Sequence, residues 1–281
     1  LREDQIKIRA YGYTERVETA MFPKFGDVHI VPPEKDHAKG TNYCVADPAG
    51  TKNWFIKWYR VVKIADDIEH TYVYREWPDY KHYGEWAVSS ERPEGRPGPA
   101  QRAEGGKGIL DYKRIILEAE GWQWDDKSGT WDGRNAENIE SRFIDPRFGS
   151  AEIASEECPT SICWLMEQEQ RNQGGNVIGP SMIWLPALVG TSNTHTQKET
   201  SVSMIADLMD YDTTQTVSVL NCPRWYVSKD CEQSIFAYRE FNGCGEKECL
   251  KDIVDCDRYL VRSDCHYVDP TRVMSWGGGG Y

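Results

Sequence analysis

The pattern of hydrophobic and polar positions predicts strands and helices that alternate through most of the chain. Runs rich in Val, Ile, Tyr and Trp predict strands, while apolar residues that recur at helical spacing between charges predict helices. The predicted strands span 43–47, 54–63, 70–77, 141–146 and 181–186, with a later hairpin of 216–221 and 224–228. The predicted helices span 109–121, 160–172, 198–212, 229–241 and 248–262. This order indicates an α/β domain with a central mixed β-sheet flanked by helices.

The same pattern divides the 281 residues into three parts. Residues 1–40 have Pro, Gly and mixed polarity without a sustained period, and we interpret them as a linker or N-terminal extension. Residues 41–270 hold every predicted element and are long enough to bury a large core. The Gly-rich segment 271–281 is predicted to be a flexible tail.

Two predicted strands end on an aspartate that is followed at once by proline. Asp47 closes the first strand in "YCVADPAG", and Asp145 closes the fourth in "FIDPRFG". Proline lacks a backbone donor and stops the strand, which leaves the carboxylate at the sheet edge where a ligand can reach it. Asp252 and Asp255 lie three residues apart on one face of the last predicted helix. Asp257 falls on another side of that helix, and we expect it to be solvated.

Carboxylates from two strands and a helix could together bind two divalent cations. Hard oxygen ligands suit Mg²⁺ or Mn²⁺, and two such ions roughly 3.5–4 Å apart can clamp the attacking and leaving oxygens of a phosphodiester. Each acid alone has a simpler explanation, because Asp before Pro favours a turn and an acid pair on a helix is usually solvated. The combination, in this order and on this kind of sheet, favours the metal site.

These segments resemble the nuclease domain of bacteriophage large terminases, the DNA-packaging motor subunit. "VADPAGTKNWFIKWYRVV", with "YVYREWPD" after it, is similar to the first hairpin of that domain, and "SRFIDPRFGSA" is similar to its second acidic strand. "NCPRWYVSKDCEQSIFAYREF", with "KDIVDCDRYL" after it, is similar to its closing section. The resemblance covers residues 40–262, and "AMFPKFGDVHIV" resembles the linker after the motor domain. It implies a ribonuclease H-like fold and metal-dependent endonuclease activity that cuts concatemeric viral DNA during genome packaging.

The resemblance also implies roles for four acids. Asp47, Asp145 and Asp255 match the three metal-binding, catalytic acids of the family. Asp252 matches a position that often holds a further acid or a His, so the resemblance implies an auxiliary metal ligand there. The implied cofactor is Mg²⁺ or Mn²⁺ in a two-metal site.

The chain departs from a complete large terminase in one respect. A phosphate-binding loop of the form GxxxxGK[ST] is not found, since "EGGKGI" lacks the first Gly and the Ser or Thr after Lys107. We therefore expect a nuclease part that cleaves DNA without translocating it, with residues 1–40 following a missing ATPase domain. The resemblance implies double-stranded DNA as substrate. The implied partners are the portal protein, the small terminase subunit and the ATPase domain of the same subunit, in the host cell cytoplasm and without a membrane.

Composition limits how such a protein could contact DNA. The net charge of −12 argues against a general nucleic-acid coat protein, so cationic contacts must be local. The candidate DNA-binding residues are Arg147, Lys52, Lys57, Arg60, Lys107 and Arg258. Arg147 is the strongest of them, because it follows Asp145 by two residues.

The cysteines bear on the redox compartment of the protein, and its one long uncharged stretch bears on whether the chain crosses a membrane. Nine cysteines, an odd number in a long chain, point to free thiols and a reducing compartment. Residues 172–197 carry no Asp, Glu, Lys or Arg, but their apolar core "MIWLPALV" is too short to cross a bilayer. We therefore predict a buried strand and a loop in that stretch.

Other hypotheses stay open. Another ribonuclease H-like nuclease, of the junction resolvase or transposase type, would share the metal site and act on different DNA. A glycosidase or sugar-binding domain could use paired carboxylates and some of the eleven Trp. A glycosidase needs no divalent metal, so metal dependence separates these classes. A structural packaging module with a decayed site is disfavoured, because every expected acid is present.

Overall fold

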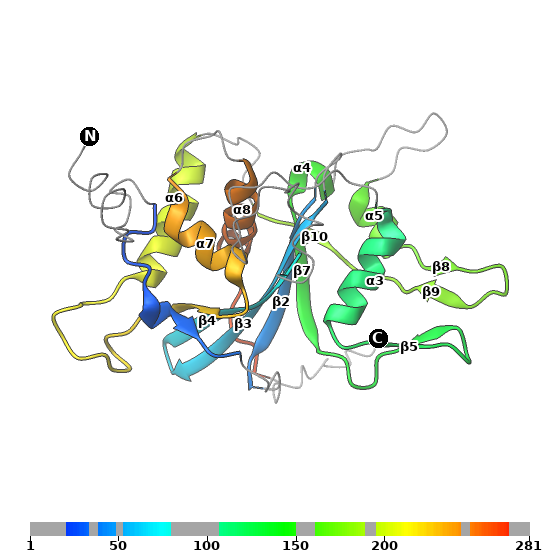
Figure 1. Ribbon diagram of the computed structural model, residues 1–281, viewed down its shortest axis with the longest axis horizontal. Coiled ribbons are helices and arrows are strands. Elements are labelled where there is room, and N and C mark those ends of the chain that lie inside the picture. The colour runs from blue at the N-terminus through cyan, green and yellow to red at the C-terminus, as the bar shows by residue number, and fades with distance from the viewer. Residues whose placement is uncertain are drawn as a thin grey trace, which may run out of the picture.

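A seven-stranded sheet forms the centre of the molecule. The computed structural model describes residues 21–33, 39–48, 53–79, 107–149, 161–188, 195–242 and 248–269. Within them the strand order is β1-β11-β4-β3-β2-β7-β10 (Figure 1). The strands are β1 (Ile30–Val31), β2 (Thr41–Asp47), β3 (Phe55–Ala65), β4 (Ile68–Trp77), β7 (Ile139–Ile144), β10 (Leu185–Pro186) and β11 (Trp225–Ser228).

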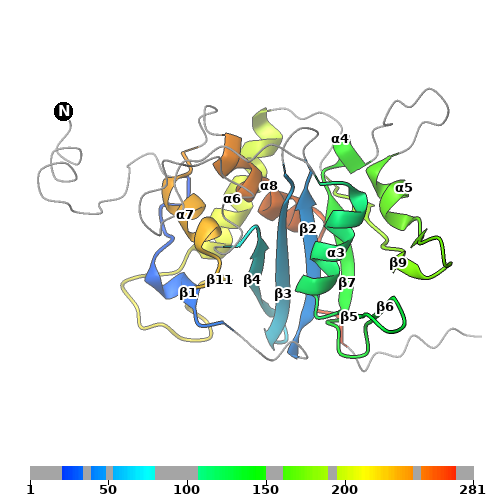
Figure 2. The same ribbon diagram turned by 45° about the vertical axis from the view of Figure 1, so that its right-hand side comes forward.

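The sheet is mixed, as predicted. β3 pairs antiparallel with β2 and with β4, whereas the other described pairs in this sheet are parallel. Figure 2 shows β4, β3 and β2 side by side, which is the meander expected from the short turns between them. Because β2 and β7 run parallel, their carboxyl ends meet at the same edge of the sheet.

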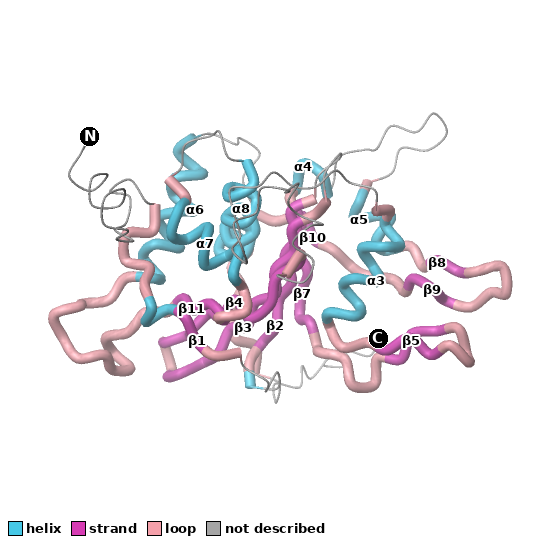
Figure 3. The backbone as a smooth tube through the Cα atoms, in the orientation of Figure 1, coloured by secondary structure: helices cyan, strands magenta, loops and turns pink. Residues whose placement is uncertain are grey.

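Helices cover both faces of the sheet (Figure 3). α6 (His195–Met209), α7 (Glu232–Glu240) and α8 (Glu248–Arg262) pack on one face, and α3 (Ile109–Ala119) and α5 (Ile162–Glu167) pack on the other. Alternate residues of β3 enter the two cores, with Phe55 and Tyr59 on the α8 side and Ile56 and Trp58 on the α3 side. The smaller elements are η1 (Asp27–His29), α4 (Pro146–Gly149), β5 (Gln123–Asp125), β6 (Thr130–Asp132), β8 (Gln170–Arg171) and β9 (Val177–Gly179).

The helix of 248–262 has its predicted bounds, and most other predicted elements are found with ends shifted by one to three residues. Three predictions differ more. The hairpin of 216–221 and 224–228 was wrong, because β11 pairs in parallel with β1 and β4 and the earlier segment is an exposed loop. The helix predicted over 160–172 ends at Glu167, since Gln170–Arg171 pairs with β9. The strand predicted over 181–186 shortens to Leu185–Pro186, where proline limits pairing at the sheet edge.

The domain begins earlier than residue 41. Phe22 and Phe25 are buried in the core on the α7 and α8 side, and β1 pairs with β11. Residues 21–33 are therefore part of the folded unit, which corrects their assignment to a linker. A two-residue strand and two isolated aromatic anchors are too short to give a periodic signal. Residues 1–20 and the predicted tail 271–281 lie outside the described residues.

Two expectations from composition can be compared with the structure. The six cysteines whose side chains are described are Cys44, Cys163, Cys222, Cys231, Cys256 and Cys265, and all of them are free thiols. Among the helices in the described ranges, none has the length and apolar character that crossing a membrane requires.

Candidate active site

Topology brings the two strand-end aspartates together. β2 and β7 are adjacent and parallel, Ala46 is paired with Ile144, and the amide of Asp145 donates to the carbonyl of Ala46 at 3.3 Å. Side chains alternate along a strand, so Asp47 and Asp145 point to the same face as Val45 and Phe143, which is the α8 face. The sequence predicted two acids at a sheet edge, and the structure brings them to one edge and one face.

The third acid comes from α8. Asp47, Asp145 and Asp255 are only 5 %, 1 % and 4 % exposed, and α8 packs against β2. Tyr259, one turn beyond Asp255, donates its hydroxyl to Asp145 Oδ2 at 2.6 Å. Burial raises the pKa of Tyr259, and the charges of Asp47, Asp255 and Asp145 raise it further. Asp145 is the acid bonded to this buried phenol, and the negative charges of Asp47 and Asp255 also disfavour its ionisation.

Each of two carboxylates has an arginine of its own. Asp145 accepts from the backbone amide of Arg147 at 2.7 Å and from its guanidinium at 2.8 and 3.3 Å. Asp255 is bonded to Arg258, which is itself buried, and Lys251 lies 4.0 Å away. Burial alone would raise the pKa of Asp145, but the hydrogen bonds from Arg147 and Tyr259 outweigh it and lower that pKa. Two of the three acids are thus paired with cationic side chains.

The donor chemistry of the site suits a hard divalent cation, because carboxylate oxygens are the ligands that Mg²⁺ and Mn²⁺ prefer. In the part of the chain that the structure describes, no three acids, histidines or cysteines are gathered closely enough to hold a metal. Arg147 and Arg258 stand beside the carboxylates instead. The acids are of the right chemical type for such an ion, and a ligand set would require the arginines to move and the carboxylates to come closer together.

Asp252 lies one turn before Asp255 on α8 and is partly buried. It shares the side of the helix that carries Asp255, as expected from the spacing of three residues. Its role as an auxiliary ligand stays a prediction.

Three candidate DNA contacts are enclosed by protein, which corrects their assignment to the surface. Lys57 is fully buried and donates to Asp257 at 2.5 Å and to the hydroxyl of Tyr238 at 3.1 Å. Arg60 is also fully buried. Arg258 is almost fully buried against Asp255. From Phe55 to Val61 every residue of β3 is buried, so neither alternating side of this part of the strand faces solvent.

The remaining candidates differ in position. Arg147 is half-exposed at the edge where Asp145 lies, as expected for a residue that could meet a phosphate. Lys107 is partly buried and precedes α3, on the face of the sheet opposite to α8. Lys52 lies outside the described residues.

Asp257 is not solvated, contrary to expectation. It is fully buried and accepts from Lys57, from the hydroxyl of Tyr59 at 2.8 Å and from that of Tyr238 at 3.0 Å. Sequence reasoning missed this network and also missed Tyr259. Tyr259 could have been found from its spacing, since it follows Asp255 by four residues and so lies on the same face of α8.

Replacing Tyr259 with Phe is expected to lower the free energy of unfolding by about 1.5–3 kcal/mol, since the lost hydrogen bond is to a charged group. Urea unfolding followed by circular dichroism measures this. Tyr211→Phe is the matched control, because Tyr211 makes a ring contact with His29 and no hydrogen bond is found for its hydroxyl among the described residues. Equal losses in both variants would show that the bond to Asp145 contributes nothing.

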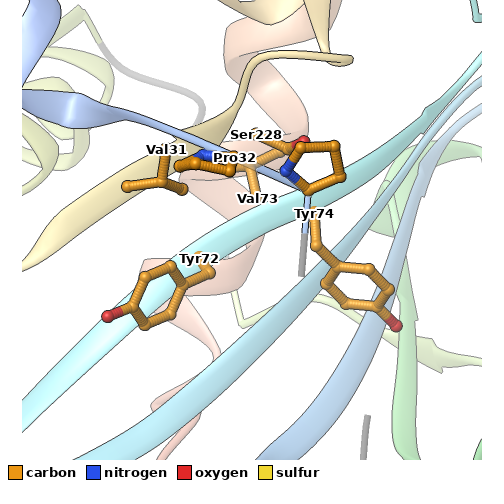
Figure 4. Close-up of a pocket in the computed structure, with 7 residues that line it drawn as sticks. Val31, Pro32, Tyr72, Val73, Tyr74 and Ser228 are labelled. Carbon is orange, nitrogen blue, oxygen red and sulfur yellow. The ribbon is translucent and has the colours of Figure 1, made fainter. Parts of the chain in front are cut away.

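A cavity of about 380 Å³ lies elsewhere, at the junction of β1, β4 and β11 (Figure 4). Its lining residues are Val31, Pro32, Pro33, Tyr72, Val73, Tyr74 and Ser228. In the sheet, β3 separates β1, β11 and β4 from β2 and β7, so the cavity is separate from the carboxylate site.

One known structure shares the architecture closely enough to compare folds. No protein-family model matches the chain, and no curated protein is significantly similar to it in sequence. The P22 large terminase nuclease domain is 10% identical, with a TM-score of 0.50 over 88% of this chain and 93% of that one.

A second similar structure is the large terminase of a thermophilic bacteriophage. It is 13% identical, with a TM-score of 0.45 over 86% of this chain, which spans only 44% of that protein. The similarity to the P22 domain carries the conclusion about fold: the chain has the ribonuclease H-like fold of a terminase nuclease domain.

Proposed function

We propose that this protein is a divalent-metal-dependent DNA endonuclease that cuts concatemeric viral DNA during genome packaging. The observation that carries the proposal is the placement of Asp47 and Asp145 at the carboxyl ends of the adjacent strands β2 and β7, with Tyr259 of α8 bonded to Asp145 and Asp255 one turn before it on the same helix. The fold shared with the P22 large terminase nuclease domain supports it. A nuclease of the junction resolvase or transposase type would use the same acids on different DNA.

The proposed cofactor is Mg²⁺ or Mn²⁺, held by Asp47, Asp145 and Asp255 with Asp252 as an auxiliary ligand. When bound, the ions would lower the pKa of the attacking water and neutralise charge on the phosphodiester. Tyr259 orients the carboxylate of Asp145 through its hydrogen bond. Burial of the three acids restricts their side-chain freedom, and the arginines bonded to Asp145 and Asp255 would have to move before a cation binds there.

The proposed substrate is double-stranded DNA, met at the sheet edge where Arg147 is exposed. Phosphate contacts of this kind would position DNA without reading its sequence, so we expect little sequence specificity. The portal protein, the small terminase subunit and an ATPase domain of the same subunit are the proposed partners, in the host cell cytoplasm.

The test of the proposal is nicking of supercoiled plasmid by the purified chain. We expect open circles with Mg²⁺ or Mn²⁺ and none with EDTA, and full recovery when excess Mn²⁺ is added back after EDTA. Calorimetric titration with Mn²⁺ provides a readout that does not depend on cleavage. Failure to cleave together with failure to bind Mn²⁺ would refute the proposal, and cleavage that persists in EDTA would refute its metal dependence.

A further inference from the structure

The carboxylate of Asp145 has no hydrogen-bonding capacity left. Its Oδ1 accepts from the backbone amide of Arg147 at 2.7 Å and from Nε of Arg147 at 3.3 Å. Its Oδ2 accepts from Nη2 of Arg147 at 2.8 Å and from the hydroxyl of Tyr259 at 2.6 Å. A carboxylate offers about four lone-pair positions. A cation can therefore bind Asp145 only after one of these donors has left.

The side chain of Arg147 is the donor that can leave at the lowest cost. The amide of Arg147 is fixed at the start of α4, and Tyr259 is almost fully buried on α8. The guanidinium side chain, by contrast, is 55% exposed, so water can solvate it when it swings away. Its departure would free one position on each oxygen, while the amide and Tyr259 would still orient the carboxylate.

The guanidinium stays near the site after it leaves, because Arg147 is only two residues from Asp145. Its planar fork matches a phosphate as well as it matches a carboxylate. Arg258, the other arginine beside these acids, is enclosed by protein and cannot reach out to DNA in the same way. Arg147 can thus bind the carboxylate of Asp145 in one state and a phosphate group in another.

We propose that Arg147 is a switch that closes Asp145 in the resting protein and passes to a DNA phosphate when a divalent cation enters. This inference rests on the proposed nuclease function. It implies that the cation and DNA bind cooperatively, since each favours the displaced arginine. Linkage requires the coupling to be reciprocal, so DNA strengthens metal binding by the same factor as metal strengthens DNA binding.

Calorimetric titration with Mn²⁺ tests the competition at Asp145. Arg147→Gln is expected to bind Mn²⁺ about fivefold more tightly than the wild type, because the competing fork is gone. Arg147→Lys keeps the charge but cannot cover both oxygens, so its affinity should lie between the two. Arg171→Gln, which removes an exposed arginine on β8, is the matched control and should match the wild type.

Two results would refute the proposal that Arg147 competes with the cation for Asp145. One is unchanged or weaker Mn²⁺ binding by Arg147→Gln. The other is an Arg147→Lys variant that behaves as the wild type, which would mean that long-range charge alone opposes the metal. If the wild type itself neither binds Mn²⁺ nor cleaves DNA, the proposed nuclease function fails before the switch is tested, so the two failures are distinguishable.

Fluorescence anisotropy of a short labelled duplex tests the transfer to phosphate. Ca²⁺ serves as the probe cation, with EDTA as the metal-free reference. We expect Ca²⁺ to tighten DNA binding by the wild type about fivefold and to leave Arg147→Gln unchanged. If Ca²⁺ tightened DNA binding equally in the wild type and in Arg147→Gln, the proposed transfer of Arg147 to a DNA phosphate would be refuted.

Discussion

Nicking is expected to slow at least about a thousandfold when Asp47 or Asp145 is replaced by Asn, a loss of ~4 kcal/mol in transition-state stabilisation. Asp47 is the last residue of β2 and Asp145 directly follows the parallel strand β7, and both are almost fully buried on the α8 side. Asn keeps the shape and one accepting oxygen but removes the charge that a divalent cation requires. The measurement is the rate at which supercoiled plasmid becomes open circles at saturating Mn²⁺.

Asp66→Asn is the matched control for these variants. Asp66 is fully exposed in the turn after β3, at the opposite end of that strand from Phe55, which is paired with Asp47. Its variant should cleave as the wild type. The site variants should stay folded, and Asp145→Asn should lose no more than about 3 kcal/mol on urea unfolding, because Asn keeps an oxygen that can accept from Tyr259 and the arginine paired with Asp145 is half-exposed. A folded Asp47 or Asp145 variant that retains a tenth of the activity would refute the site.

The acids at the site could be predicted from sequence because local rules fix their positions. A strand ends where proline removes a donor, and alternation fixes the face of the last residue. Asp47 and Asp145 follow both rules on strands with clear apolar patterns. The helix of 248–262 has an equally clear pattern, which placed Asp255 correctly along the chain.

The buried ion pair between Lys57 and Asp257 could not be predicted from sequence, because it depends on long-range packing. Lys57 alternates with apolar neighbours as a surface lysine would, yet β3 is the strand that helices cover on both faces. Asp257 lies two residues from Asp255 and thus on another side of α8, which also turned out to be buried. Nothing local indicates that these two residues, far apart in sequence, satisfy each other. The two-residue strand β1 was missed for the same reason, since its pairing with β11 is its main signal.

The second large expected effect is a loss of stability when the buried ion pair of Lys57 and Asp257 is broken. Replacing Lys57 with Met, or Asp257 with Asn, is expected to lower the free energy of unfolding by ~3–5 kcal/mol, because each change leaves the other charge in the core without its hydrogen-bonded partner. Both side chains are fully buried, with 2.5 Å between Nζ of Lys57 and Oδ1 of Asp257. Urea unfolding at neutral pH measures the loss.

A double-mutant cycle separates the ion pair from its surroundings. The double variant Lys57→Met with Asp257→Asn removes both charges and keeps an acceptor for Tyr59 and Tyr238, so it should lose less than the two single variants together. Lys63→Met is the control, because Lys63 pairs with Asp66 at the surface and should cost at most ~1 kcal/mol. Additive losses would show that the two charges do not depend on each other.

The same pair should influence the active site through α8. Asp257 ties that helix to β3, and Asp255 lies only two residues earlier on it. If the network fixes how α8 lies on the sheet, Lys57→Met should weaken calorimetric Mn²⁺ binding even where the variant is fully folded. The double variant, with no unpaired charge to move the helix, should recover most of that affinity. Unchanged Mn²⁺ binding in folded Lys57→Met would mean that the network stabilises the core without positioning Asp255.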